Sequence, residues 1–181
     1  MGNKIAIVYK SRTGFTKRYA EMIAEEVECT LLDFSDVNSK IMSEFDTVVY
    51  GSRLHAGNID GYKKAKEMFD KSTAKQFVLF VTGATPARAE DVINDLWKNN
   101  LSNDEMESIP HFYMQSGLCY EKMCFADKTM MKMAAIMMKN KKDKTDHEKG
   151  FEEAISKSYD ISSKEYIKDI VALLKNKLNF N

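Results

Sequence analysis

Five short apolar runs alternate with four helical patterns along this sequence, and this alternation limits the possible folds more than any other feature. Five runs are short and mainly apolar, with many β-branched or aromatic residues: 4–9, 29–34, 46–52, 76–83 and 109–115. Such runs are typical of strands buried on both faces. Apolar residues with helical spacing follow over 19–27, 58–69 and 87–99, and a last helix begins near Ser162 or Ser163. The pattern predicts an α/β fold with parallel strands, right-handed crossovers and helices on both faces.

Composition and charge exclude several classes of protein. The 181 residues are 44% hydrophobic and 30% charged, as in a soluble globular chain, and we expect a single domain over 1–181. Lys plus Arg equals Asp plus Glu at 27 each, which argues against a nucleic-acid binder. We find no apolar run of the ~18–20 residues that a membrane span needs, and we expect no signal peptide. Three scattered cysteines suggest neither a disulfide framework nor a metal site, so we expect a cytoplasmic protein.

One stretch, 118–160, does not fit the alternation and is interpreted as an insertion. Residues 122–149 hold 8 Lys and 4 acidic residues (8 − 4 = +4), and six of the 12 methionines lie between 123 and 138. An amphipathic helix here is expected either to face an anionic membrane surface or an apolar substrate, or to pack on the core of the domain. Within it, Cys119 and Cys124 are expected either to pack as small apolar residues or to form a redox pair.

The loop after the first strand has the composition of a phosphate site. In an open parallel sheet, ligands bind beyond the carboxyl ends of the strands. Hydroxyls, backbone amides and a helix N-terminus together suit a phosphate, and a glycine lets the backbone approach it. Neither GxxxxGK[ST] nor GxGxxG is present. The alternative is an ordinary helix start capped by a hydroxyl. The predicted site residues are Ser11, Arg12, Thr13, Gly14, Phe15 and Thr16.

Ser11, Thr13, Gly14 and Thr16 match the pattern [ST]-x-T-G-x-T, and in this the chain resembles the flavodoxin family. The resemblance implies a doubly wound sheet of five parallel strands in the order 2-1-3-4-5, with FMN bound where the strand order reverses. It also implies that the flavin carries the chemistry and that no side chain is catalytic. A phosphoryl-receiver domain shares this fold, but Tyr9-Lys10-Ser11 lacks the acidic cluster that such a domain needs.

The same resemblance implies that the loops after the third and fourth strands flank the flavin ring. Gly57 is expected to provide a peptide that reorients when the flavin N5 is protonated, and Gly83 to allow close backbone contact with the ring. His55 is expected either to contact the flavin or to lie at the surface. The residues implied are Ser52, Arg53, Leu54, His55, Ala56, Gly57 and Asn58, then Thr82, Gly83, Ala84 and Thr85, and also Gly117 at the start of the insertion.

The insertion resembles that of one branch of the family, the menaquinone-dependent protoporphyrinogen oxidases. The resemblance is carried by Gly117-Leu118-Cys119-Tyr120, by the Met- and Lys-rich segment 130–139 and by Lys144-Thr145-Asp146. It implies an FMN-dependent oxidoreductase whose partner is a redox protein or a small hydrophobic substrate such as a quinone or a porphyrin. It also implies peripheral contact of the insertion with the inner face of the membrane. Two alternatives are a soluble electron carrier and a non-catalytic interaction domain. The oligomeric state is not predicted.

Overall fold

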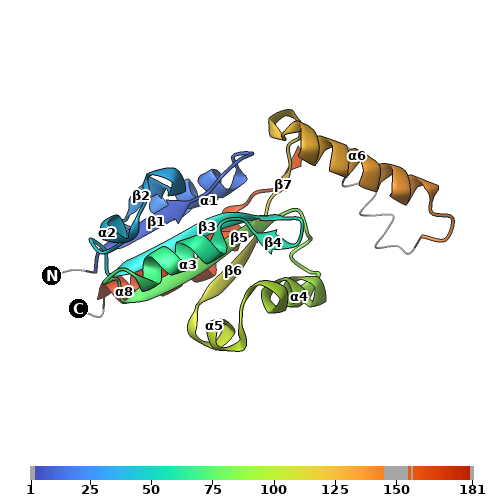
Figure 1. Ribbon diagram of the computed structural model, residues 1–181. Coiled ribbons are helices and arrows are strands. Elements are labelled where there is room, and N and C mark those ends of the chain that lie inside the picture. Colours follow the sequence, from blue (N-terminus) through green and yellow to red (C-terminus); the bar gives the residue numbers. More distant parts are fainter. Residues whose placement is uncertain (1–2, 145–154, 156, 180–181) are drawn as a thin grey trace.

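A mostly parallel sheet forms the centre of the computed structural model, which describes residues 3–144, 155 and 157–179 (Figure 1). The main path of the sheet has the order β2-β1-β3-β5-β6, and every neighbouring pair on it is parallel. The strands on this path are β1 (Ile5–Tyr9), β2 (Thr30–Asp33), β3 (Thr47–His55), β5 (Gln76–Gly83) and β6 (His111–Gln115). The predicted α/β class with parallel strands is confirmed.

A sixth strand changes the predicted count and numbering. The sequence predicted five strands in the order 2-1-3-4-5, whereas the sheet has six, because β4 (Asn58–Ile59) pairs antiparallel with the end of β3. Ala56 (φ 47°) and Gly57 (φ 79°) both adopt left-handed backbone conformations and so reverse the chain between these strands. The helix predicted from residue 58 therefore starts later, as α3 (Tyr62–Asp70).

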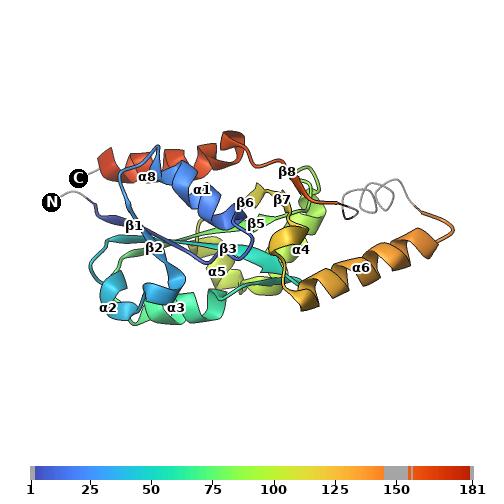
Figure 2. The same cartoon turned by 90° about the horizontal axis from the view of Figure 1, so that it is seen from above.

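Helices cover both faces of the sheet, as Figure 2 shows. One face carries α1 (Phe15–Ala24) and α8 (Lys168–Asn179), and α8 follows the short 3-10 helix η3 (Lys164–Ile167). The other face carries α2 (Ser39–Met42), α3, α4 (Glu90–Asn100) and α5 (Asn103–Ser108), and another 3-10 helix, η1 (Phe34–Asp36), follows β2. The sequence did not predict α2 and α5. Both are short, and both begin at a side-chain cap, at Asn38 and Ser102 respectively.

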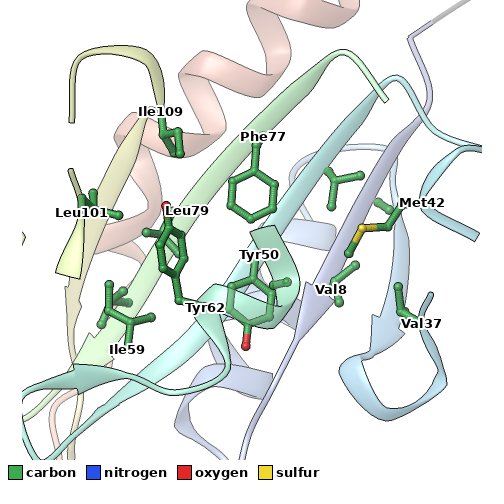
Figure 3. Close-up of a cluster of buried hydrophobic side chains, with 14 of the residues drawn as sticks. Val8, Val37, Met42, Tyr50, Ile59, Tyr62, Phe77, Leu79, Leu101 and Ile109 are labelled. Carbon is green, nitrogen blue, oxygen red and sulfur yellow. The ribbon is translucent and has the colours of Figure 1, made fainter. Parts of the chain in front are cut away.

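Two apolar clusters, one on each face of the sheet, explain why the strands are almost continuously apolar. Ile7 and Val49 belong to the cluster that includes residues of α1 and α8, whereas Val8 and Val48 belong to the cluster that includes residues of α2, α3 and α4, and all four are fully buried. Figure 3 shows the second cluster, where Tyr50 stacks on Phe77 with ring centroids 6.5 Å apart. Both faces of each central strand therefore exclude water, as expected of a parallel sheet.

The insertion lies outside these layers. Its helix α6 (Phe125–Asn140) extends away from the sheet in both views (Figures 1 and 2). At its base are the 3-10 helix η2 (Tyr120–Lys122) and the antiparallel pair of β7 (Gly117–Leu118) with β8 (Tyr159–Asp160).

Apolar side chains on α6 are exposed to solvent. The exposed fraction is 86% for Phe125, 60% for Met133 and 71% for Met137, so the prediction that this helix packs on the core is wrong. Thr145 and Asp146, on which part of the family resemblance rests, lie outside the described residues. In the part of the chain that the structure describes, we find no helix long and apolar enough to cross a membrane.

Candidate cofactor site

The loop after β1 ends at a helix N-terminus that no side chain caps. Gly14 is the N-cap of α1, with φ 100° in the left-handed region and no side-chain hydrogen bond to the first amides of the helix. The alternative of a helix start capped by a hydroxyl is therefore wrong. Free amides at a helix N-terminus, together with its positive dipole end, favour an anion.

Ser11 adds a hydroxyl with an unusual environment to the same loop. Its Oγ is buried and has no hydrogen-bond partner. An unpaired buried hydroxyl costs about 1–3 kcal/mol, so such groups generally have a partner. A phosphate oxygen beside this loop would provide one. The residues present therefore fit a phosphorylated ligand.

A lysine from the insertion reaches the same loop. A Cβ added to Gly14 would lie 3.6 Å from Nζ of Lys122, which belongs to η2. The lysine thus places a positive charge beside the uncapped amides of α1. Sequence reasoning missed Lys122, and its only signal was the positive surplus of the insertion as a whole.

The other predicted residues of this loop differ in exposure. Arg12 is exposed, Thr13 is half-buried and Phe15 is buried. Thr16 is 1% exposed, and its Oγ1 shares a 2.9 Å hydrogen bond with Oγ1 of Thr82. This bond joins α1 to the carboxyl end of β5, so the hydroxyl of Thr16 already has a partner within the protein.

The predicted loops after β1, β3 and β5 meet at one edge of the sheet. The backbone N–H of Lys10 donates to the Gly51 carbonyl at 2.8 Å, and Thr82 Oγ1 lies 3.5 Å from the carbonyl of Ser52. Ser52 is buried, and its hydroxyl donates to the carbonyl of Asp60. The structure therefore brings the three loops together where parallel sheets bind their ligands.

The loop after β3, which the sequence predicted to flank the flavin ring, is a tight turn. Ala56 and Gly57 are the left-handed residues described above, and Asn58 Nδ2 donates to the Ala56 carbonyl at 3.0 Å. A Cβ added at Gly57 would find no atom within 4 Å, but the Gly57 carbonyl accepts a 2.9 Å hydrogen bond from Asn100 Nδ2, which holds this peptide in place. Leu54 is half-buried against the core.

The loop after β5 is held by Tyr113. A Cβ at Gly83 would lie 2.7 Å from the Tyr113 hydroxyl, which itself donates to the Thr85 carbonyl at 2.9 Å. Glycine is therefore required at position 83 because its backbone lies close to Tyr113 of β6. Ala84, next along the loop, is partly exposed.

A cluster of charged side chains joins the loop after β3 to the insertion. Arg53 Nη1 lies 3.2 Å from Oδ2 of Asp127, the third residue of α6, and Arg53 Nε lies 3.4 Å from Asp60. Nε2 of His55 lies 3.7 Å from the other oxygen of Asp127, and Lys10 Nζ lies 2.7 Å from Asp60. The base of α6 is thus attached to the loop predicted to flank the flavin.

The carboxylates of this cluster favour the charged form. Burial acts to raise the pKa of Asp127, but the hydrogen bond from Arg53 and the charge on His55 outweigh it, and the pKa is lowered. For Asp60, burial is again outweighed, here by Lys10 and Arg53, so its pKa is also lowered. Sequence reasoning missed both residues.

The remaining predicted residues lie at the base of the insertion. Gly117 is buried in β7, where a Cβ would lie 2.1 Å from the carbonyl oxygen of Tyr159. All three cysteines are free. Cys124 Sγ accepts a hydrogen bond from the backbone N–H of Asp127 at 3.4 Å and so caps α6. The thiol of Cys119 donates to Oε2 of Glu121 at 3.5 Å.

A match to a family of known proteins accounts for this arrangement of loops. The model of the family described as "Flavodoxin domain" matches residues 6–148. This chain belongs to the flavodoxin family. The match supports FMN as the cofactor, and the three loops that meet at the carboxyl edge of this flavodoxin domain provide a place for it. A search of curated proteins found no match.

Solved structures similar to this flavodoxin domain share little sequence with it. A flavodoxin from the domain Archaea is 19% identical, with 62% of this chain and 84% of that chain covered and a TM-score of 0.40. A flavoprotein in complex with FMN from Lactobacillus acidophilus is 16% identical, with 62% and 92% covered and a TM-score of 0.42. Rubredoxin oxygen:oxidoreductase from Desulfovibrio gigas is 17% identical, with 97% and 37% covered and a TM-score of 0.45. All three scores are below 0.5, so the assignment rests on the family match.

Proposed function

We propose that this chain is an FMN-dependent electron-transfer protein that binds the cofactor noncovalently at the carboxyl edge of its sheet. The observation that carries the proposal is the buried, unpartnered hydroxyl of Ser11 beside the uncapped N-terminus of α1. FMN, when bound, supplies the electron chemistry, and the protein holds and orients it.

The roles of the individual residues follow from their positions. Ser11, Thr13 and the amides that follow Gly14 would hold the phosphate, and Lys122 would balance part of its charge. The loops 52–58 and 82–85 would flank the ring system. A side chain at Gly57 would meet no neighbour, but reorientation of its peptide near the ring would require the carbonyl to release its hydrogen bond from Asn100. Arg53 and His55, held by Asp127, would lie at the same edge.

We further propose that the reaction partner is hydrophobic, as in the menaquinone-dependent protoporphyrinogen oxidases. The exposed Phe125, Met133 and Met137 support this, because flexible methionine surfaces suit irregular apolar partners such as a quinone tail or a porphyrin face. In this proposal 1–181 is one domain with an insertion over about 118–160, located in the cytoplasm or at the inner face of the membrane.

A second candidate is a soluble electron carrier without substrate chemistry of its own. Two observations favour a hydrophobic reaction partner over this carrier role: the net charge of zero and the exposed apolar residues of α6. A carrier needs only a redox protein as partner, and an exposed apolar helix is not required for that.

Two matched hydroxyl substitutions test the phosphate site. Ser11→Ala removes the unpartnered hydroxyl and is expected to weaken FMN binding by about 1–3 kcal/mol while leaving riboflavin, which lacks the phosphate, unaffected. Thr16→Ala is the control, because its hydroxyl bonds Thr82, and it is expected to change FMN and riboflavin affinity equally. Fluorescence titration measures both ligands. Equal losses of the two ligands in Ser11→Ala would contradict the proposed phosphate contact.

A further inference from the structure

A hollow lies at the base of α6, on a side of the helix that the proposed function does not use. It has a volume of ≈ 570 Å³ and lies between α6, the segment of η2 and the residues just before β8. This volume is within the usual range for small-molecule sites, about 300–1,000 Å³.

The hollow is lined by a positive stripe of α6. Lys128, Lys132 and Ala135 line it, and their spacing of four and then three residues places them on one side of the helix. The exposed Met130, Met133 and Met137 have the same kind of spacing but lie on another side. The hollow is thus distinct from the exposed apolar surface.

The charge in the hollow is strongly positive. Lys157 joins Lys128 and Lys132, and Glu121 is the one acidic residue of the lining, so the sum is 3 − 1 = +2. Among the described residues, none of the three lysines forms a close ion pair, although the charge of Lys128 acts on Glu121 and helps to lower its pKa. The ion pair of Asp127 with Arg53 lies at the other side of the base of α6 and involves none of these three lysines.

The floor is apolar and held in place by hydrogen bonds. Ile155 is 2% exposed, and the hydroxyl of Tyr120 donates to its carbonyl. The backbone N–H of Tyr120 donates to Ser158 Oγ at 2.9 Å, and Ser158 in turn donates to Glu121 at 2.7 Å. The two sides of the hollow are therefore joined, and part of the Glu121 charge is already satisfied within the protein.

We propose that this hollow is a binding site for an amphipathic organic anion, a molecule with an apolar body and at least one carboxylate, sulfonate or phosphate group. The apolar floor of Tyr120, Ala135 and Ile155 would bury the body, and the lysines would pair with the acidic group. The proposal goes beyond FMN binding, because none of these residues belongs to the cofactor loops.

Calorimetric titration of the FMN-saturated chain with anilinonaphthalene sulfonate tests the site. One saturable site is expected, and added salt is expected to weaken it. Lys132→Gln and Lys157→Gln are each expected to lower the affinity roughly threefold to fivefold. Lys139→Gln removes the same charge from α6 outside the hollow and is expected to change nothing. The absence of saturable binding, or an equal effect of Lys139→Gln, would overturn the proposal.

Two further experiments distinguish the hollow from two other places where an anionic amphiphile could bind, the exposed apolar face of α6 and a membrane surface. Met133→Ser combined with Met137→Ser is expected to leave titration with the sulfonate unchanged, and a loss of binding would place the ligand on the exposed face instead. Vesicles of phosphatidylglycerol and phosphatidylcholine test for a lipid headgroup. If Lys132→Gln weakens sedimentation with these vesicles but not binding of the sulfonate, the lysines serve a membrane surface and the proposed site is wrong.

Discussion

Asp127→Asn is expected to loosen the insertion without destabilising the sheet. Asp127 is 8% exposed, and the side chain of its partner Arg53 is 16% exposed, with 3.2 Å between the paired atoms. Two unit charges at this separation attract by about 5 kcal/mol at an effective dielectric constant of ~20, and desolvation offsets much of this. Arg53 also keeps Asp60 as a partner. We therefore expect a net loss of about 1–2 kcal/mol.

The loss should appear locally, because α6 lies outside the two apolar clusters. Hydrogen exchange of the amides of residues 125–132 is expected to become about fivefold to thirtyfold faster, while exchange in β1, β3 and β5 is unchanged. Asp95→Asn is the control, since its pair with Lys98 is exposed. Unchanged exchange in α6, or an equal acceleration in the central strands, would refute the reasoning.

The direction of the pKa shift of Asp127 determines how the attachment of α6 to Arg53 depends on pH. Because the folded-state pKa of Asp127 is lowered, its stabilising contribution is present above the ordinary aspartate range. The contribution is lost as pH falls through the lowered value. Exchange of α6 in the parent protein is therefore expected to accelerate only below about pH 4, whereas in Asp127→Asn that acid step should be missing.

Two further outcomes concern the sheet and the exposed helix face. Gly51→Ala would place a Cβ 2.1 Å from the ring of Phe80 in the centre of the sheet. The resulting overpacking is expected to cost about 2–3 kcal/mol of stability and to lower Tm by roughly 5–10 °C. A Tm within a degree of the parent's would show that the Phe80 ring moves aside without cost. The double substitution Met133→Ser with Met137→Ser is expected to leave Tm unchanged, because both side chains are exposed. It is expected to slow electron transfer to a quinone but not to a small soluble dye. If the double variant transfers electrons to both acceptors at the parent's rates, the soluble-carrier proposal is favoured.

The central strands of the fold could be predicted because both of their faces are buried, and this burial appears in the sequence as continuous apolar runs. Val48 and Val49 are neighbours in β3 that enter opposite clusters, and both are 0% exposed, so the strand has no polar face to interrupt the run. In contrast, β4 has two residues and no periodicity, and its position depends on the left-handed backbone of Ala56. Such turns leave little trace in hydrophobic patterning.

The insertion marks where sequence reasoning stops. A helix with apolar residues on one side has the same pattern whether that side faces a core or a partner, so the pattern alone could not place Met133. Asp127 and Lys122 were missed for a different reason. Asp127 pairs with a residue 74 positions earlier, and Lys122 approaches Gly14 from another element, so both contacts depend on the tertiary fold.

The central claim is that FMN binds at the carboxyl edge with its phosphate in the loop after β1. Titration of the flavin-free chain with FMN and, separately, with riboflavin tests it most directly, with quenching of flavin fluorescence as the readout. Saturable binding of FMN at one site per chain is expected, with riboflavin bound far more weakly because the helix N-terminus, Ser11 and Lys122 have no anion to hold. No saturable binding of FMN, or equal affinity for the two flavins, would contradict the account.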